Sequence, residues 1–168
     1  AGAVTVEAGA SHSIVITSQG AAFSFGCGLH GRLGHGGHAD VFIPVQVKAL
    51  AQLPELRVVQ AAAGAAHSLF RTAGGAVFGC GFNCMGQVGV HAELRGDLHA
   101  AASSSEGDKN QKDGPVDTKE VRSSKSVSSS SSSSSSSVLV PLRVMGEIGD
   151  SKVVNISAGR WHSVATVE

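Results

Sequence analysis

Short apolar and β-branched segments, separated by turn-forming residues, recur along the chain and predict β-strands. His12 to Thr17 is apolar and β-branched, Ser18-Gln19-Gly20 has the composition of a turn, and Ala21 to Gly26 predicts the returning strand. The same pattern returns in Ser68 to Thr72, Ala73-Gly74-Gly75 and Ala76 to Cys80. Each of these two segments therefore predicts a β-hairpin.

Two further strands are expected around Val45 to Leu50, after Pro44, and around Arg57 to Ala62. With the hairpins they give roughly four short strands per repeat, which is the pattern of a propeller blade. Apolar faces with the period of a helix extend over no more than a turn or two. The sequence therefore predicts an all-β protein and argues against a helical solenoid.

One motif, A-G-x-x-H-S, occurs three times and defines the repeat. Its fixed positions are Gly9, His12, Ser13; Gly64, His67, Ser68; and Gly159, His162, Ser163. Further glycines continue the register from the first copy to the second, Gly26 with Gly81, Gly31 with Gly86 and Gly34 with Gly89, all at an offset of 55 residues. A residue type that returns in every repeat is most simply structural, and we expect each of these histidines to be buried and to hydrogen-bond to backbone.

The second copy contains an insertion. Ile43-Pro44-Val45 corresponds to Val140-Pro141-Leu142, 97 residues later instead of 55, so about 42 residues have been added. The insertion falls on the stretch 90–137, which holds 13 of the 26 charged residues and ends in ten consecutive serines. Serines bury too little apolar surface to offset the entropy of ordering, so this stretch is predicted to be disordered.

The second copy continues as Cys80-Gly81-Phe82-Asn83-Cys84-Met85-Gly86-Gln87-Val88-Gly89, and the first as Phe25-Gly26-Cys27-Gly28-Leu29-His30-Gly31-Arg32-Leu33-Gly34. With A-G-x-x-H-S and the following Pro, these segments resemble the repeat of the regulator of chromosome condensation family. Phe25 and Cys80 replace the family's usual Trp, and Gly28 stands where the second copy has Asn83, which we expect to be a structural position of the repeat. The resemblance implies a partial β-propeller of four-stranded antiparallel blades, about two blades plus the start of a third.

The domain organisation follows from the repeat. Repeat one is expected over 4–50, repeat two over 51–89 and 138–150, the insertion over 90–137, and the opening strands of repeat three over 151–168. Two blades cannot close a ring, so the remaining blades of a longer polypeptide, or other chains, are expected partners.

Charge and composition exclude several functions. Thirteen basic and thirteen acidic residues give no net charge, and no basic stripe suggests direct nucleic-acid binding. Apolar runs fall short of a membrane span, a signal peptide is not evident, and an odd number of cysteines, three, favours free thiols. We expect an intracellular protein, cytoplasmic or nuclear.

Catalytic machinery is not visible in the sequence. The Gly-rich stretch 26–37 lacks the G-K-[ST] ending of a phosphate-binding loop, and the G-x-S-x-G and H-E-x-x-H motifs are absent. His30, His35 and His38 share one loop, and Cys80 and Cys84 form C-x3-C, so a transition-metal site is conceivable. Solvated loop histidines are far commoner, however, and no second C-x2-C pair is present. We therefore expect a non-enzymatic protein without metal or cofactor.

Two functions remain. The resemblance implies a protein-interaction module of a larger regulatory protein, or alternatively a guanine-nucleotide exchange factor for a small GTPase such as Ran, associated with chromatin. Exchange would need clustered loop acids, and the candidates Asp40, Glu55 and Asp150 are scattered.

The variable positions of the repeat predict where a partner binds. They hold Ala10-Ser11 and Ala65-Ala66 in the first two copies but Arg160-Trp161 in the third. Arg and Trp are enriched in binding hot spots, so Arg160 and Trp161 are the predicted partner-binding residues. The alternative is that Trp161 packs against a following blade.

Overall fold

The structure is a computed structural model that describes residues 2–51, 56–90, 137–144 and 151–168. The disorder predicted for the insertion concerns residues 91–136, which lie outside the described residues. At the two ends of that stretch, Val90 is buried and Ser137 begins a strand.

The first sheet is a four-stranded antiparallel meander. It consists of β1 (Ala3–Ala8), β2 (His12–Thr17), β3 (Ala22–Gly26) and β4 (Val41–Gln46), hydrogen-bonded in that order. A 3-10 turn, η1 (Leu29–Gly31), lies between β3 and β4, and a single helical turn, α1 (Lys48–Ala51), follows β4. The predicted hairpin over 12–26 is confirmed.

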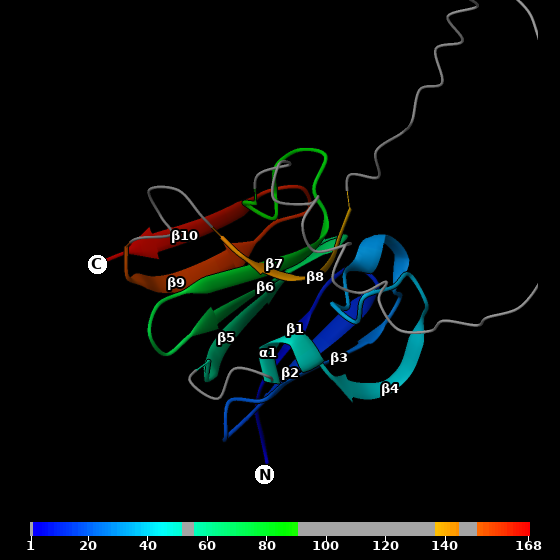
Figure 1. The fold of residues 1–168 in the computed structure, drawn as a ribbon, viewed down its shortest axis with the longest axis horizontal. Coiled ribbons are helices and arrows are strands. Elements are labelled where there is room, and N and C mark those ends of the chain that lie inside the picture. The colour runs from blue at the N-terminus through cyan, green and yellow to red at the C-terminus, as the bar shows by residue number, and fades with distance from the viewer. Residues whose placement is uncertain (1, 52–55, 91–136, 145–150) are drawn as a thin grey trace, which may run out of the picture.

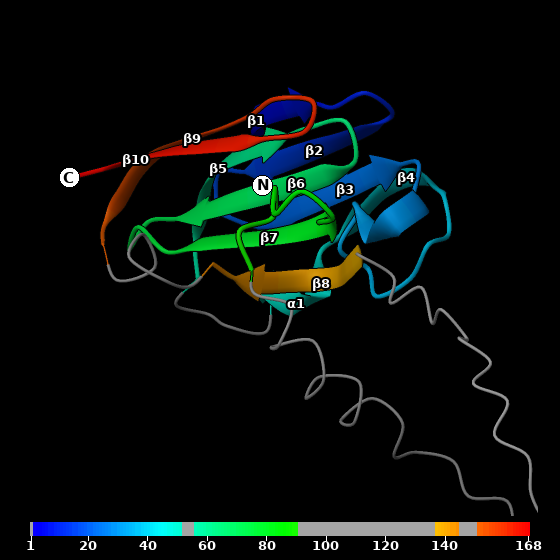
Figure 2. The same cartoon turned by 90° about the horizontal axis from the view of Figure 1, so that it is seen from above.

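The second sheet repeats the first. It consists of β5 (Val58–Ala63), β6 (His67–Thr72), β7 (Val77–Phe82) and β8 (Ser137–Arg143), again in sequence order. Figure 2 shows these strands following one another, with β8, in gold, at the edge. Even the irregularities recur, because the shift between Ala3 and Thr5 returns between Val58 and Gln60.

A third, two-stranded sheet contains β9 (Val153–Ala158) and β10 (Ser163–Val167). The second sheet lies between the first sheet and this hairpin, since β5 contacts both β2 and β9 (Figure 1). Strands β1, β5 and β9 are the successive inner strands, each in contact with the next. Four-stranded sheets arranged side by side in this way are the blades of a β-propeller, so the predicted fold class is confirmed.

The core lies between sheets. Ile14 and Ile16 of β2 meet Phe70 of β6 at the first junction, and Leu69 of β6 meets Ile156 of β9 at the second. Alternate residues of β6 therefore face opposite neighbours, which explains why this strand is buried on both sides while β2 alternates.

The strand expected at Val45 to Leu50 is wrong in position. β4 spans Val41–Gln46 with Pro44 inside it, and the chain then turns into α1. β4 is an edge strand, where a residue without an N–H is tolerated. Val47 and Leu50 are both buried, and one helical turn brings two residues three positions apart to the same side.

The strand predicted around Arg57 to Ala62 is present as β5, but it opens the second sheet and does not complete the first, whose additional strand is β1. In the described part of the chain, no helix is long and apolar enough to span a bilayer.

Candidate functional site

The three A-G-x-x-H-S turns hold each histidine ring against the glycine of its own motif. A Cβ atom placed on Gly64 would lie 2.2 Å from Cε1 of His67, and one on Gly9 would lie 2.5 Å from Cε1 of His12. Any side chain at these glycines would therefore displace the ring. The motif is a unit in which Gly makes room for His.

The first two histidines then each join their repeat to the next, whereas His162 is exposed, contrary to the expectation that all three are buried. The Nε2 atom of His12 lies 2.8 Å from the hydroxyl of Ser68, which donates to the carbonyl of Arg32 at 2.6 Å. One repeat later, His67 lies 2.9 Å from the Ser163 hydroxyl, which donates to the carbonyl of Gln87 at 2.7 Å. The expected backbone partner is thus wrong, because the imidazole bonds a hydroxyl of the following repeat.

The donors and acceptors in these hydrogen bonds determine which ring nitrogen of each histidine carries the proton. The single hydroxyl proton of Ser68 is given to a carbonyl, so the oxygen accepts from Nε2–H of His12, which leaves Nδ1 unprotonated. Burial, with the nearby charges of Arg32 and His67, lowers the pKa of His12 to about 4. Burial and His162 lower the pKa of His67 to about 4. Both rings are neutral at pH 7 and serve as structural links.

Arg32 is a residue of the candidate site that the sequence did not single out. Its side chain is 6% exposed, and it donates through Nε to the Leu29 carbonyl at 2.9 Å. Nη1 donates to the Ser11 hydroxyl at 2.6 Å and to the Ala65 carbonyl at 2.9 Å, so one guanidinium links two turns from different repeats. Arg32 occupies the position of Gln87 in the second copy, and that break in the repeat was the available signal.

These turns enclose a cleft of about 470 Å³. Its walls are the backbone and small side chains of the first two A-G-x-x turns, and its larger side chains are His30, Arg32, Arg160 and Trp161. Arg160 and Trp161 are exposed, as expected for variable turn positions, and the predicted pair lies together at this cleft.

A row of rings from the three repeats borders the cleft. The His30 and Phe82 ring centroids are 4.6 Å apart, and those of Phe82 and Trp161 are 6.0 Å apart in an edge-to-face arrangement. The Arg160 guanidinium carbon lies 5.6 Å from the Trp161 ring centroid, within the range of a cation–π contact. Trp161 is nevertheless 45% exposed, so much of its ring is open to a ligand.

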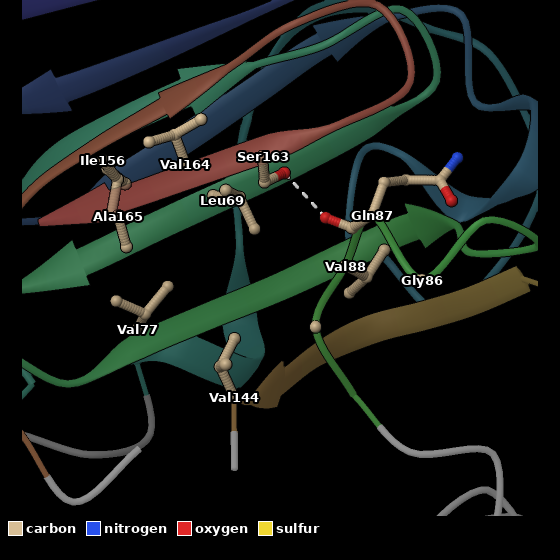
Figure 3. Close-up of a pocket in the computed structure, with 11 residues that line it drawn as sticks. Leu69, Val77, Gly86, Gln87, Val88, Val144, Ile156, Ser163, Val164 and Ala165 are labelled. Carbon is tan, nitrogen blue, oxygen red and sulfur yellow. Dashed lines mark hydrogen bonds between the residues drawn. The ribbon is translucent and has the colours of Figure 1, made fainter. Parts of the chain in front are cut away.

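A second cavity, of about 150 Å³, lies between the second sheet and the β9–β10 hairpin. Figure 3 shows its apolar lining, including Leu69, Val77 and Ile156, beside the Ser163–Gln87 hydrogen bond. Ala165 stands where Phe70 stands in the preceding repeat. At the first junction the ring of Phe70 is part of the buried core. At the second junction the smaller Ala165 lines the cavity instead.

The polar candidates Asn83 and Asp40 form hydrogen bonds within their own loops. Asn83, placed among the structural repeat positions, accepts from Val88 N–H at 2.9 Å and donates to the Val90 carbonyl at 3.1 Å. Asp40 accepts from Gly28 N–H at 2.8 Å. Glu55 and Asp150 lie outside the described residues.

The histidine and cysteine groups do not assemble a metal site in the part of the chain that the structure describes. The His30 ring contacts Phe82 in a tilted arrangement, whereas His35 contacts the Ser24 hydroxyl at 3.0 Å. Cys27, Cys80 and Cys84 are free thiols, and burial raises the pKa of the Cys80 thiol to about 12.

Radial four-stranded sheets joined by repeated His–Ser links define a β-propeller repeat protein. Two family models described as the regulator of chromosome condensation (RCC1) repeat match the chain, one at residues 19–71 and the other at 3–32 and 58–87. The chain belongs to this repeat family.

Relatives share its repeats inside much longer proteins. The chain is 42% identical over 87 residues to a bifunctional serine/threonine-protein kinase/NEDD4-like E3 ubiquitin-protein ligase of Dictyostelium discoideum, covering 52% of the chain and 5% of that protein. It is 40% identical over 88 residues to the ultraviolet-B receptor UVR8 of Arabidopsis thaliana, covering 52% and 19%. The chain therefore corresponds to a small part of either relative.

Solved propellers show the same fold over nearly the whole chain. Human WBSCR16 matches with a TM-score of 0.65 and 21% identity, covering 98% of this chain and 30% of that one. Prp20p of Saccharomyces cerevisiae, whose structure was described with its binding to Gsp1p and histones, matches with a TM-score of 0.64 and 17% identity over the same shares.

Proposed function

We propose that this chain is a non-enzymatic protein-interaction module of a larger regulatory protein, intracellular and either cytoplasmic or nuclear. The cleft bordered by Arg160 and Trp161 takes a segment of a partner protein. The observation that supports this proposal most directly is the exposed Trp161, which stands where the other copies have Ser11 and Ala66. A propeller needs no tryptophan at this position, because two of the three turns form without one.

The flanks of the chain support a second kind of partner, further repeats of the same polypeptide. Phe42 is 89% exposed on β4, whereas its counterpart Leu139 lies against the first repeat, with Cδ2 2.8 Å from where a Cβ of Gly31 would be. By the same geometry Phe42 packs on the glycine loop of a preceding blade. Its exposed surface is thus assigned to blade packing, separately from the cleft.

Replacing Trp161 tests the proposal. In the full-length protein, Trp161→Ala abolishes capture of the cleft's partner and leaves the thermal midpoint unchanged, because the ring is half-exposed. Trp161→Phe is the control, since it keeps an aromatic face. Partners are compared by quantitative mass spectrometry and then rebound as purified proteins. A loss of several kcal/mol of stability would instead place Trp161 in the core of the ring.

The second candidate is a guanine-nucleotide exchange factor. It is supported by 36% identity over 92 residues to the X-linked retinitis pigmentosa GTPase regulator homolog of Caenorhabditis elegans, and by a fold shared with Prp20p. Against it, the described residues that line the cleft include no carboxylate, and Asp40 accepts a hydrogen bond from Gly28 N–H.

Nucleotide release separates the two candidates. With a panel of small GTPases loaded with a fluorescent nucleotide, the full-length protein is expected to leave the release rate unchanged. A control with a chelator of Mg²⁺ confirms that release can be detected. Acceleration by orders of magnitude on any one GTPase would replace the interaction module with the exchange factor.

A further inference from the structure

The described residues that line the cleft carry an excess of positive charge. Among the residues that the structure describes, its lining contains Arg32 and Arg160 and neither Asp nor Glu. Burial, with the nearby Arg32 and His38, lowers the pKa of His30, so this ring is neutral at pH 7 and the positive charge comes from the arginines. The chain as a whole has no net charge, so this local excess is a property of the site.

Arg32 is a fixed cation. Its Nε and Nη1 atoms are held by Leu29, Ser11 and Ala65, and the side chain is nearly buried. Its Nη2 has no hydrogen bond to any described residue. A guanidinium that is already ordered loses little further entropy when an anion binds, and its attraction is stronger at a partly desolvated site than in water.

Arg160 is the exposed cation. Its guanidinium carbon lies over the Trp161 ring, 5.6 Å from the ring centroid, and the group carries five N–H donors for hydrogen bonds. The planar fork of arginine matches the two oxygens of a carboxylate. Trp161 supplies an apolar face beside it for the rest of the ligand.

Backbone groups of the walls are already used between repeats. Ala10 N–H donates to the Gly64 carbonyl at 3.3 Å, and Ala65 N–H donates to the Arg160 carbonyl at 3.4 Å. The walls between the arginines are otherwise alanine and glycine, which favour contact with aliphatic stems. A volume of about 470 Å³ lies within the usual range of ligand sites.

We infer that the partner segment is acidic, and that an Asp or Glu carboxylate of the partner enters this cleft between Arg160 and Arg32 while its neighbouring residue packs on Trp161. This inference rests on the proposed interaction function and names the chemistry of the partner. The commitment is to an acidic protein segment, because aromatic and alanine walls suit a peptide and the chain lacks the broad basic surface that nucleic acid needs.

The test measures binding of two fluorescently labelled peptides, oligoglutamate and oligoglutamine of equal length, to the full-length protein by anisotropy. Oligoglutamate is expected to bind more tightly, and Arg160→Gln is expected to weaken it about tenfold, since a charge-assisted hydrogen-bonded pair is lost. Arg57→Gln is the matched control, because Arg57 is exposed away from the cleft and this variant loses the same charge. It is expected to bind like the wild type.

Equal binding of the two peptides, or equal loss in Arg160→Gln and Arg57→Gln, would overturn the inference. An oligothymidine that outcompetes oligoglutamate in an Arg160-dependent manner would overturn it in favour of nucleic acid. If binding of a protein partner depends on Trp161 but not on Arg160, the inference of an acidic ligand is rejected and the proposed interaction module is retained. If partner binding depends on neither Arg160 nor Trp161, both the acidic ligand and the proposed interaction at this cleft are rejected.

Discussion

His12 and His67 each have one ring nitrogen, Nδ1, that is buried without a hydrogen-bond partner. A neutral imidazole tolerates this, since Nδ1 then has only a lone pair. A protonated ring would present a buried N–H without an acceptor, and an unpaired donor costs about 1–3 kcal/mol in addition to the burial of charge. The two inter-repeat links therefore require deprotonated histidines.

This requirement predicts that stability falls in mild acid. The folded pKa of both histidines is about 4, below the ordinary value of 6.5, so the unfolded chain binds more protons between these values. The contribution of the two neutral histidines to the free energy of unfolding is complete above pH 6.5. It decreases as the pH falls toward 4, by on the order of 2–3 kcal/mol per histidine.

Urea unfolding of the full-length protein between about pH 7 and pH 4.5 measures the effect. His38→Gln is a suitable control, because His38 is exposed and takes no part in either His–Ser link. Constant stability across this range would contradict the neutral-histidine links.

Arg32 illustrates what the sequence leaves open at the residue scale. An arginine in a glycine-rich loop is usually solvated, and the second copy has Gln87 at this position. Its burial depends on Ser11 and Ala65, which come from turns of two different repeats. Only the packing of one blade on the next brings these groups together, so local sequence could not predict the contact.

At the scale of elements, β6 is buried on both faces, because its residues pack at both junctions. Phe70 is fully buried at the first junction, whereas Ala165 at the matching position of β10 borders a cavity. The two junctions thus differ in apolar contact although their His–Ser links are the same.

Phe70→Ala is expected to destabilise the protein by about 3–5 kcal/mol, because it removes the largest fully buried side chain among the described residues and leaves a cavity. Phe70→Leu, which retains most of the apolar volume, is expected to cost about 1 kcal/mol. The free energies come from urea unfolding of the full-length protein. Similar values for the two variants would show that the junction does not depend on the volume of this ring.

Strand positions were predicted well where alternation and turn residues agreed, as in β2 and β6. The prediction failed after Pro44, because a strand that contains proline at a sheet edge and a helical turn that buries Val47 and Leu50 both follow from tertiary contacts. Apolar residues spaced three apart over so short a segment do not distinguish the two structures.

At the scale of the whole molecule, the offset of the repeats predicted more than any single motif. It placed His12 and His67 at equivalent points of two blades and located the insertion between β7 and β8. The candidate site was only partly predictable. Arg160 and Trp161 stood out by breaking the pattern, but the contributions of Arg32, His30 and Phe82 required the three-dimensional arrangement of the turns.

The His–Ser links run in one direction, from the imidazole of each repeat to the hydroxyl of the next. Every repeat thus contains both halves of the joint, one for each neighbour. A duplicated repeat placed beside its parent by recombination would find a matching partner on both sides without any compensating substitution. Selection could then alter the number of blades independently of the joints between them, and variation would accumulate at the loop positions that the joints leave free.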